Sequence, residues 1–178
     1  MDVLNEVRLL KADLLSTECD WDKMKTSANR LREIGGSDAY DFFIGLLDLD
    51  YKYALSRNIA ALTIMDIDDN KAVEPLINAI LKKENINHNG TLVYALEKFD
   101  CSNKFKELFE ILFYHGYEAK IGARHILAEQ QFSFTQQDLI EIKSKWEELK
   151  LHPIKNYEDA KELIDEVVGR YLPYLEAN

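Results

Sequence analysis

Residues 26–47 read TSANRLREIGGSDAYDFFIGLL, and residues 58–80 repeat their apolar pattern as NIAALTIMDIDDNKAVEPLINAI. With a shift of 33 residues, seven apolar positions of the first segment fall on apolar positions of the second. The matched pairs are Ala28 with Ala61, Leu31 with Ile64, Ile34 with Ile67, Tyr40 with Val73, Phe43 with Leu76, Ile44 with Ile77 and Leu47 with Ile80. Within each segment the apolar spacing is three and four residues, which is typical of one helical face. Each segment therefore predicts two antiparallel helices joined by a tight turn.

The pattern continues into two further copies. A shift of 32 residues extends it through residues 89–113, and a weaker copy covers residues 120–146, where Lys143 replaces an apolar residue. A single helix pair cannot bury its apolar stripe alone, so such units stack on one another. The expected helices cover residues 2–16, 21–34, 38–48, 52–66, 70–84, 89–99, 103–115, 118–130, 135–150 and 156–171.

The turns between these helices carry residues suited to helix ends. Gly35 and Gly36 are suited to stop one helix. Side-chain oxygens then offer N-caps for the helices that follow. The candidates are Ser37 or Asp38, the run Asp68-Asp69-Asn70, the run from Asp100 to Asn103, and Ser133 or Thr135. With only 7 Gly and 3 Pro in 178 residues, we expect one all-α domain over residues 1–178. Its repeats lie at about 21–50, 51–86, 87–117 and 118–150. Capping helices are expected at both ends, the first helix at the N-terminal end and a helix over 154–175 at the C-terminal end.

One repeat resembles a known family. SRNIAAL at residues 56–62, followed by DNKAVEPLI at residues 69–77, closely resembles a HEAT repeat of the short type also seen in phycobilisome lyases. Arg57 matches the usual arginine of that family, and Asp68 or Asp69 matches its acid at the turn between helices. Asn89 stands in place of the arginine in the next repeat, which departs from the pattern. The resemblance covers residues 21–150 and implies a right-handed α-solenoid of about four HEAT-like helix pairs that serves as a binding surface.

Composition limits the class of partner. The chain has 32 acidic and 22 basic residues and a formal net charge of −10. Phosphate backbones repel such a protein, so we expect no direct nucleic-acid binding and a basic protein partner instead. Acidity that merely keeps the protein soluble is the alternative. Cys19 and Cys101 indicate free thiols. The N-terminus lacks the pattern of a signal peptide, and no run is long enough to cross a bilayer, so we expect a cytoplasmic protein with no membrane contact.

The sequence offers no clear catalytic or cofactor motif. It contains no HExxH, phosphate-binding glycine loop or GxSxG element. The four histidines, His88, His115, His125 and His152, lack the spacing of metal ligands. We therefore expect no enzyme activity, no metal and no cofactor. A carboxylate pair for acid–base chemistry stays open, because 32 acids make close approach by chance common.

A row of polar residues is expected on the second helices of successive pairs, which in such a stack line the inner face. An acidic row with an aromatic residue would suit a partner rich in Lys or Arg. An ordinary solvated helix face is the alternative. Phe105, Phe109 and Phe113 have core spacing and are expected inside. The candidate partner-binding residues are Asp41, Asp48, Glu74, Asn78, Glu107, Glu110, Tyr114, Gln137 and Glu141.

These observations predict a non-catalytic, monomeric protein-binding module. A small acidic protein without catalytic motifs is similar to the immunity proteins of bacterial contact-dependent growth inhibition and polymorphic toxin systems. That resemblance implies an inhibitor that neutralises a basic, nuclease-type toxin domain. A general HEAT-repeat adaptor is the alternative, and a lyase-like protein that handles a chromophore is a third. HEAT-like DNA glycosylases need a basic inner face. The net charge of −10 argues against such a DNA-binding function here.

Overall fold

The computed structural model describes residues 2–155 and 157–176, and every regular element in these ranges is a helix. The prediction of an all-α fold is confirmed. The α-helices are α1 (Val3–Leu15), α2 (Trp21–Ile34), α3 (Ser37–Leu47), α4 (Ala54–Ile67), α5 (Val73–Leu81), α6 (Gly90–Leu96), α7 (Phe105–Tyr114), α8 (Tyr117–Glu129), α9 (Gln136–Leu151), α10 (Tyr157–Tyr171) and α11 (Pro173–Glu176). There are also three short 3-10 helices in the described ranges: Tyr51–Tyr53 before α4, Asn70–Ala72 before α5 and Lys83–Asn85 after α5.

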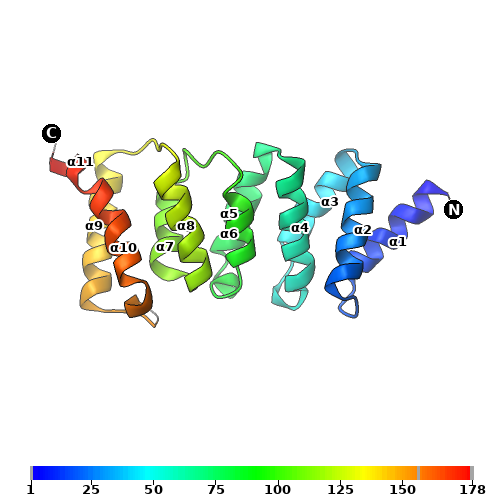
Figure 1. Ribbon diagram of the computed structural model, residues 1–178, viewed down its shortest axis with the longest axis horizontal. Coiled ribbons are helices and arrows are strands. Elements are labelled where there is room, and N and C mark those ends of the chain that lie inside the picture. Colours follow the sequence, from blue (N-terminus) through cyan, green and yellow to red (C-terminus); the bar gives the residue numbers. More distant parts are fainter. Residues whose placement is uncertain (1, 156, 177–178) are drawn as a thin grey trace.

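The helices stand side by side in an elongated row with the termini at opposite ends (Figure 1). Helices α2, α4, α6, α8 and α10 follow one another in one layer, which we call the first layer, and α3, α5, α7 and α9 form the second layer. The two layers pack on each other most closely between α3 and α4 and between α7 and α8. Helix α1 packs on α2 at the N-terminal end.

The matched apolar positions supply the core, as the repeat pattern predicts. Of the seven pairs, most members are buried, Tyr40, Ile44 and Ile67 are partly buried against the same core, and Ile34 is partly buried. Phe105, Phe109 and Phe113 are buried, as predicted. Leu139 and Ile142 of the weaker copy are also buried, whereas Lys143 is exposed. The three-and-four spacing therefore located the core faces correctly.

The predicted helix caps have mixed outcomes. Thr135 caps α9 in a capping box, with its side chain accepting from the backbone of Asp138. The prediction of Ser37 or Asp38 as a cap is wrong, because Gly36 is the N-cap of α3 and Ser37 is already its first residue. Gly35 and Gly36 have φ values of 74° and 87°, where glycine alone is unstrained, so both residues serve the sharp reversal between α2 and α3. Asp69 caps the 3-10 turn before α5.

The run from Asp100 to Asn103 does not cap α7, so that prediction is also wrong. The N-cap of α7 is Lys104, with no side-chain cap bond. Asp100 instead accepts from the backbone N–H of Ser102 at 2.9 Å within the turn.

The C-terminal region extends the stack. Helix α10 packs on α8 and α9. The Tyr171 hydroxyl donates to the Leu127 carbonyl at 2.7 Å, and its ring meets those of Phe105 and Phe109 edge-on at 4.9 and 5.6 Å. Helix α11, which the sequence pattern did not predict, packs on α9.

Three buried polar residues occupy equivalent positions near the starts of α4, α6 and α8. The first, Arg57, is fully buried, and its guanidinium donates to the Asn85 side chain and to the His88 carbonyl at 3.1 Å. Asn85 in turn donates to the Ala79 carbonyl at 2.7 Å, near the end of α5. Burial lowers the pKa of Arg57 from its usual value, and Glu84 partly offsets this.

Asn89 and Lys120 instead donate directly to carbonyls of the second-layer helix that precedes each of them. Asn89 donates to the Ile80 carbonyl at 3.0 Å. The Lys120 ammonium donates to the carbonyls of Leu112 and Phe113 at 2.8 and 2.6 Å, at the end of α7. The last carbonyls of a helix have no partner within the helix, so these side chains satisfy buried groups that would otherwise be unpaired.

We predict that Arg57→Met lowers the free energy of unfolding by about 2–4 kcal/mol, because it leaves buried acceptors without donors. Urea denaturation followed by circular dichroism measures the change. Arg32→Met is the matched control: Arg32 forms a half-exposed pair with Asp66 at 2.5 Å, and its loss should cost less than about 1 kcal/mol. Equal costs for the two variants would contradict a special role for the buried arginine.

Candidate functional site

The nine residues of the predicted row all lie on α3, α5, α7 and α9 or directly at their ends, and so belong to the second layer. Glu107, Glu110 and Tyr114 are partly buried, and the other six are exposed. The sequence reasoning therefore placed these residues on one side of the stack. The expected row left out the lysines that lie on the same helices or at their ends.

Those lysines pair with most of the acids in the row. The Lys82 ammonium bonds to both the carboxylate and the backbone carbonyl of Asp48. Lys104, whose side chain is only 9% exposed, pairs with Glu74 and lies 3.8 Å from Glu107. These contacts join neighbouring second-layer helices and leave little uncompensated charge at this part of the row.

The C-terminal half of the row is similar. Lys145 on α9 pairs with Glu110 at 2.9 Å, and Lys106 on α7 lies 3.7 Å from Glu141. Asp41 differs, because no ion pair or side-chain hydrogen bond is recorded for its carboxylate within the described residues. The row is a mixed, self-paired surface rather than a continuous acidic strip.

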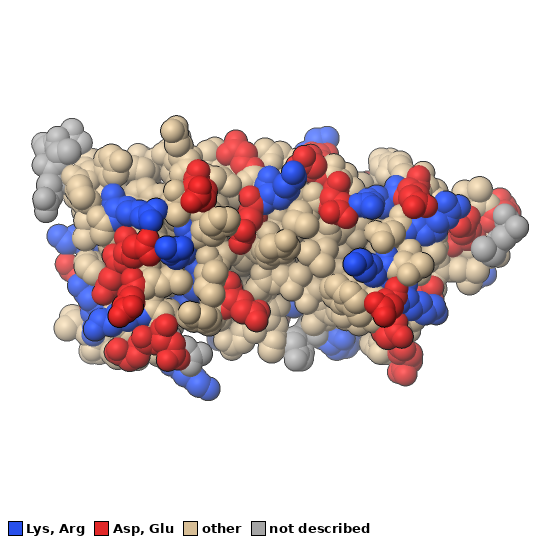
Figure 2. Space-filling model, viewed as in Figure 1, with Lys and Arg blue, Asp and Glu red and all other residues tan. Residues whose placement is uncertain are grey.

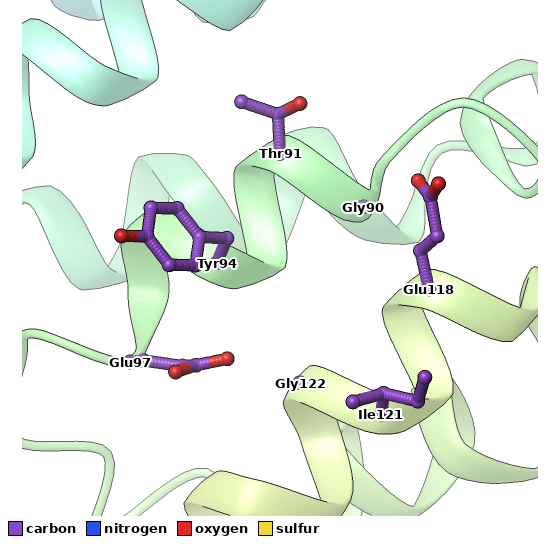
Figure 3. A pocket seen from close by; sticks show the side chains of 7 residues that line it. All are labelled: Gly90, Thr91, Tyr94, Glu97, Glu118, Ile121 and Gly122. Atoms are coloured by element: carbon purple, nitrogen blue, oxygen red, sulfur yellow. The ribbon is translucent and has the colours of Figure 1, made fainter.

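The first layer carries a different feature, a groove between α6 and α8 that the sequence reasoning missed (Figure 3). Its volume is ≈ 360 Å³, and its lining is mainly apolar. Tyr94 and Glu97 project from α6 and its C-terminal end, while Glu118 and Ile121 project from α8. Tyr94 is 56% exposed and Ile121 is 44% exposed, so two large apolar side chains face solvent here.

The groove depends on close approach of α6 and α8. A Cβ atom at Gly122 would lie 2.7 Å from the Val93 side chain, so this position requires glycine unless Val93 moves. A Cβ atom at Gly90 would meet the Glu118 side chain at 2.6 Å. The two glycines thus let α6 and α8 approach closely in the groove that Tyr94 also lines. The spacing of Gly90, Tyr94 and Glu97 on one helical face was a signal that could have revealed the groove.

The two carboxylates of the groove differ in their partners. Glu97 bonds to the His125 ring at 2.8 Å. Glu118 is exposed and makes no recorded ion pair or side-chain hydrogen bond with any part of the chain that the structure describes. Figure 2 shows that the middle of this face carries few charged side chains, in contrast to the dense mixture at the C-terminal end. The groove thus combines apolar area with an unpaired negative charge.

The remaining titratable groups of interest are buried beneath the surface. Burial lowers the pKa of Lys120 to about 8, and its ammonium is engaged with helix carbonyls. Burial lowers the pKa of His115 to about 4 and raises that of the Cys101 thiol to about 12. Cys19 and Cys101 are free cysteines. In residues 2–155 and 157–176, no group of three or more His, Cys, Asp or Glu side chains could hold a metal ion.

We predict that reversing Glu74 and Glu107 together destabilises the fold. The double variant Glu74→Lys, Glu107→Lys surrounds the nearly buried Lys104 with like charges, and should lower the free energy of unfolding by about 1–2 kcal/mol. Asp41→Lys, at an exposed acid without a recorded partner, is the control and should change it by less than about 0.5 kcal/mol. Unfolding curves of equal midpoint would show that the lysine pairs contribute nothing.

A second prediction concerns acid pH. Asn89 Nδ2 lies 2.5 Å from His115 Nδ1 and can only donate, so the ring must be neutral to accept. The folded pKa of about 4 lies below the usual 6.5, so His115 supports stability above pH 6.5 and loses that support as pH falls toward 4. The loss should be on the order of 3 kcal/mol. Urea midpoints measured between pH 7 and 4 should fall less steeply for His115→Gln than for the wild type, and identical slopes would contradict the assignment.

No helix in the described ranges is both long and apolar enough to cross a membrane. Comparisons with protein-family models, with curated proteins and with solved structures find no match to this chain. The function must therefore be argued from the geometry above.

Proposed function

We propose that this protein is a non-catalytic protein-binding module whose partner is a basic protein. The observation that carries the proposal is the groove between α6 and α8, which exposed Tyr94 and Ile121 line together with the unpaired carboxylate of Glu118. Tyrosine and aliphatic side chains of this kind are typical anchors of protein interfaces. The net charge of −10 favours a basic partner and would speed its encounter.

The more specific proposal is an acidic immunity or inhibitor protein that occludes a basic, nuclease-type toxin domain. A nuclease binds phosphate through a positively charged surface, so an acidic inhibitor can occupy the same surface. Elongated helical stacks suit this role because they offer a long, preformed binding face. We further propose that the stack is a right-handed HEAT-like solenoid of about four repeats, as the residues around Arg57 suggest, and that it is cytoplasmic and monomeric.

A general adaptor is the second candidate, because the same groove would also accept a segment of a larger complex. The two candidates differ in the partner that they predict. An inhibitor has one basic, enzymatic partner, whereas an adaptor has several partners that belong to one assembly. A lyase-like protein would instead hold a pigment.

Affinity capture from the native host tests the proposal. The tagged full chain is used as bait at low salt, with an unrelated acidic protein of similar net charge as control. We expect one basic protein on this bait alone, released by raised NaCl because screening weakens the attraction between charges. The purified partner should show nuclease activity that one equivalent of this protein abolishes. Retention of several subunits of one complex would favour the adaptor, and a bait that retains nothing would overturn both protein-binding proposals.

A further inference from the structure

Contacts between a basic side chain and an acid link neighbouring first-layer helices on both sides of the groove. Between α2 and α4, Arg32 pairs with Asp66 at 2.5 Å. Between α4 and α6, Lys98, just beyond the end of α6, lies 3.7 Å from Asp68. An arginine or lysine thus compensates an acid at each of these two boundaries.

The boundary between α8 and α10 has the same feature. Arg124 reaches Glu166 with two guanidinium nitrogens, at 3.0 and 2.9 Å, and Arg170 adds a contact to the same carboxylate at 2.7 Å. These paired charges bridge the two helices.

The boundary between α6 and α8 contains two carboxylates and no lysine or arginine paired with either in the described residues. His125 contacts Glu97, and Glu118 at the other end of the groove is uncompensated. Tyr94 and Ile121 line the same groove: Tyr94 lies near Glu97, and the Glu118 carboxylate lies at the other end beside Gly90 (Figure 3). The other boundaries pair their acids with Arg or Lys, whereas here His125 pairs with Glu97 and the carboxylate of Glu118 has no cation beside it in the described residues.

We infer that the groove between α6 and α8 receives an arginine side chain from the partner protein, with the guanidinium against Tyr94 and bonded to Glu118. The inference rests on the proposed protein-binding function and names the chemistry that the groove recognises. Arginine fits better than lysine, because its planar guanidinium stacks on an aromatic ring and can bind a carboxylate through two nitrogens. The aliphatic part of the arginine side chain would pack against the apolar side chain of Ile121.

A titration with a defined peptide tests the chemistry without the natural partner. The probe is Ac-Ala-Arg-Ala-NH2, and the control is the same peptide with citrulline, which keeps the shape of arginine and lacks its charge. One side chain should bind with a dissociation constant on the order of millimolar, which amide and methyl chemical shifts can measure. We expect shifts for the arginine peptide at Gly90, Tyr94, Ile121 and Gly122, and much smaller shifts for citrulline.

Two variants sharpen the titration. Glu118→Gln should weaken binding of the arginine peptide about five-fold or more, because it replaces a charge-assisted hydrogen bond with a neutral one. Glu147→Gln, at an exposed acid of α9 outside the predicted row, should leave binding unchanged. Thermal melting checks that both variants fold. Equal binding of citrulline, no shifts at all, shifts confined to the second layer, or no effect of Glu118→Gln would each overturn the inference.

Capture from the host separates this inference from the proposed function. Baits carrying Glu118→Lys and the control Glu147→Lys are compared with the wild type. Loss of the captured protein with Glu118→Lys alone supports the groove as its contact. Retention by both baits overturns the groove while leaving the binding function intact. An empty wild-type column contradicts the binding function, and the peptide titration still decides what the groove recognises.

Discussion

The buried ends of the second-layer helices impose the constraint on which the rest of the stack depends. Helices α5 and α7 end inside the molecule, where their last carbonyls would lack partners. Asn89 and Lys120 donate directly to those carbonyls, and Arg57 acts through Asn85. Each donor comes from a first-layer helix or its N-cap, so the same hydrogen bonds also connect the two layers. A repeat that lost its donor would have to expose the helix end or leave the carbonyls unsatisfied.

This arrangement explains why one equivalent position can hold Arg57, Asn89 and Lys120. Arginine reaches two acceptors at a distance, lysine reaches two adjacent carbonyls, and asparagine is short. Where the short residue stands, His115 completes the contact as a neutral acceptor. The departure from the arginine pattern at Asn89 therefore comes with a change of acceptors, because Arg57 bonds to the segment that follows α5 and Asn89 bonds to α5 itself. It also falls at the start of α6, the helix that carries the groove.

Much of the fold could be predicted from the sequence, because apolar spacing reports directly on burial. The repeat matched Leu31 with Ile64 and Leu96, and all three are buried. Helix caps were harder to predict, since Ser37 could equally follow a glycine turn as the first helical residue. The acidic row was placed on one layer correctly, but its pairing was not foreseen. Pairs such as Glu74 with Lys104 join residues 30 positions apart, and a repeat alignment of apolar residues carries no information about them.

Because ion pairs compensate many of the acids, net charge alone is a weak guide to the binding surface. An acid that meets a lysine of the neighbouring helix contributes little field and would have to lose that lysine before it could bind a partner. An acid such as Glu118, with no cation of its own, keeps its charge available and gains most when a partner supplies one. The overall excess of acidic residues speeds the encounter with a basic partner. The orientation of the bound partner depends instead on the few sites where an uncompensated charge lies next to exposed apolar side chains. In this chain the groove between α6 and α8 combines these two features. It lies on the first layer, whereas the predicted acidic row lies on the second layer.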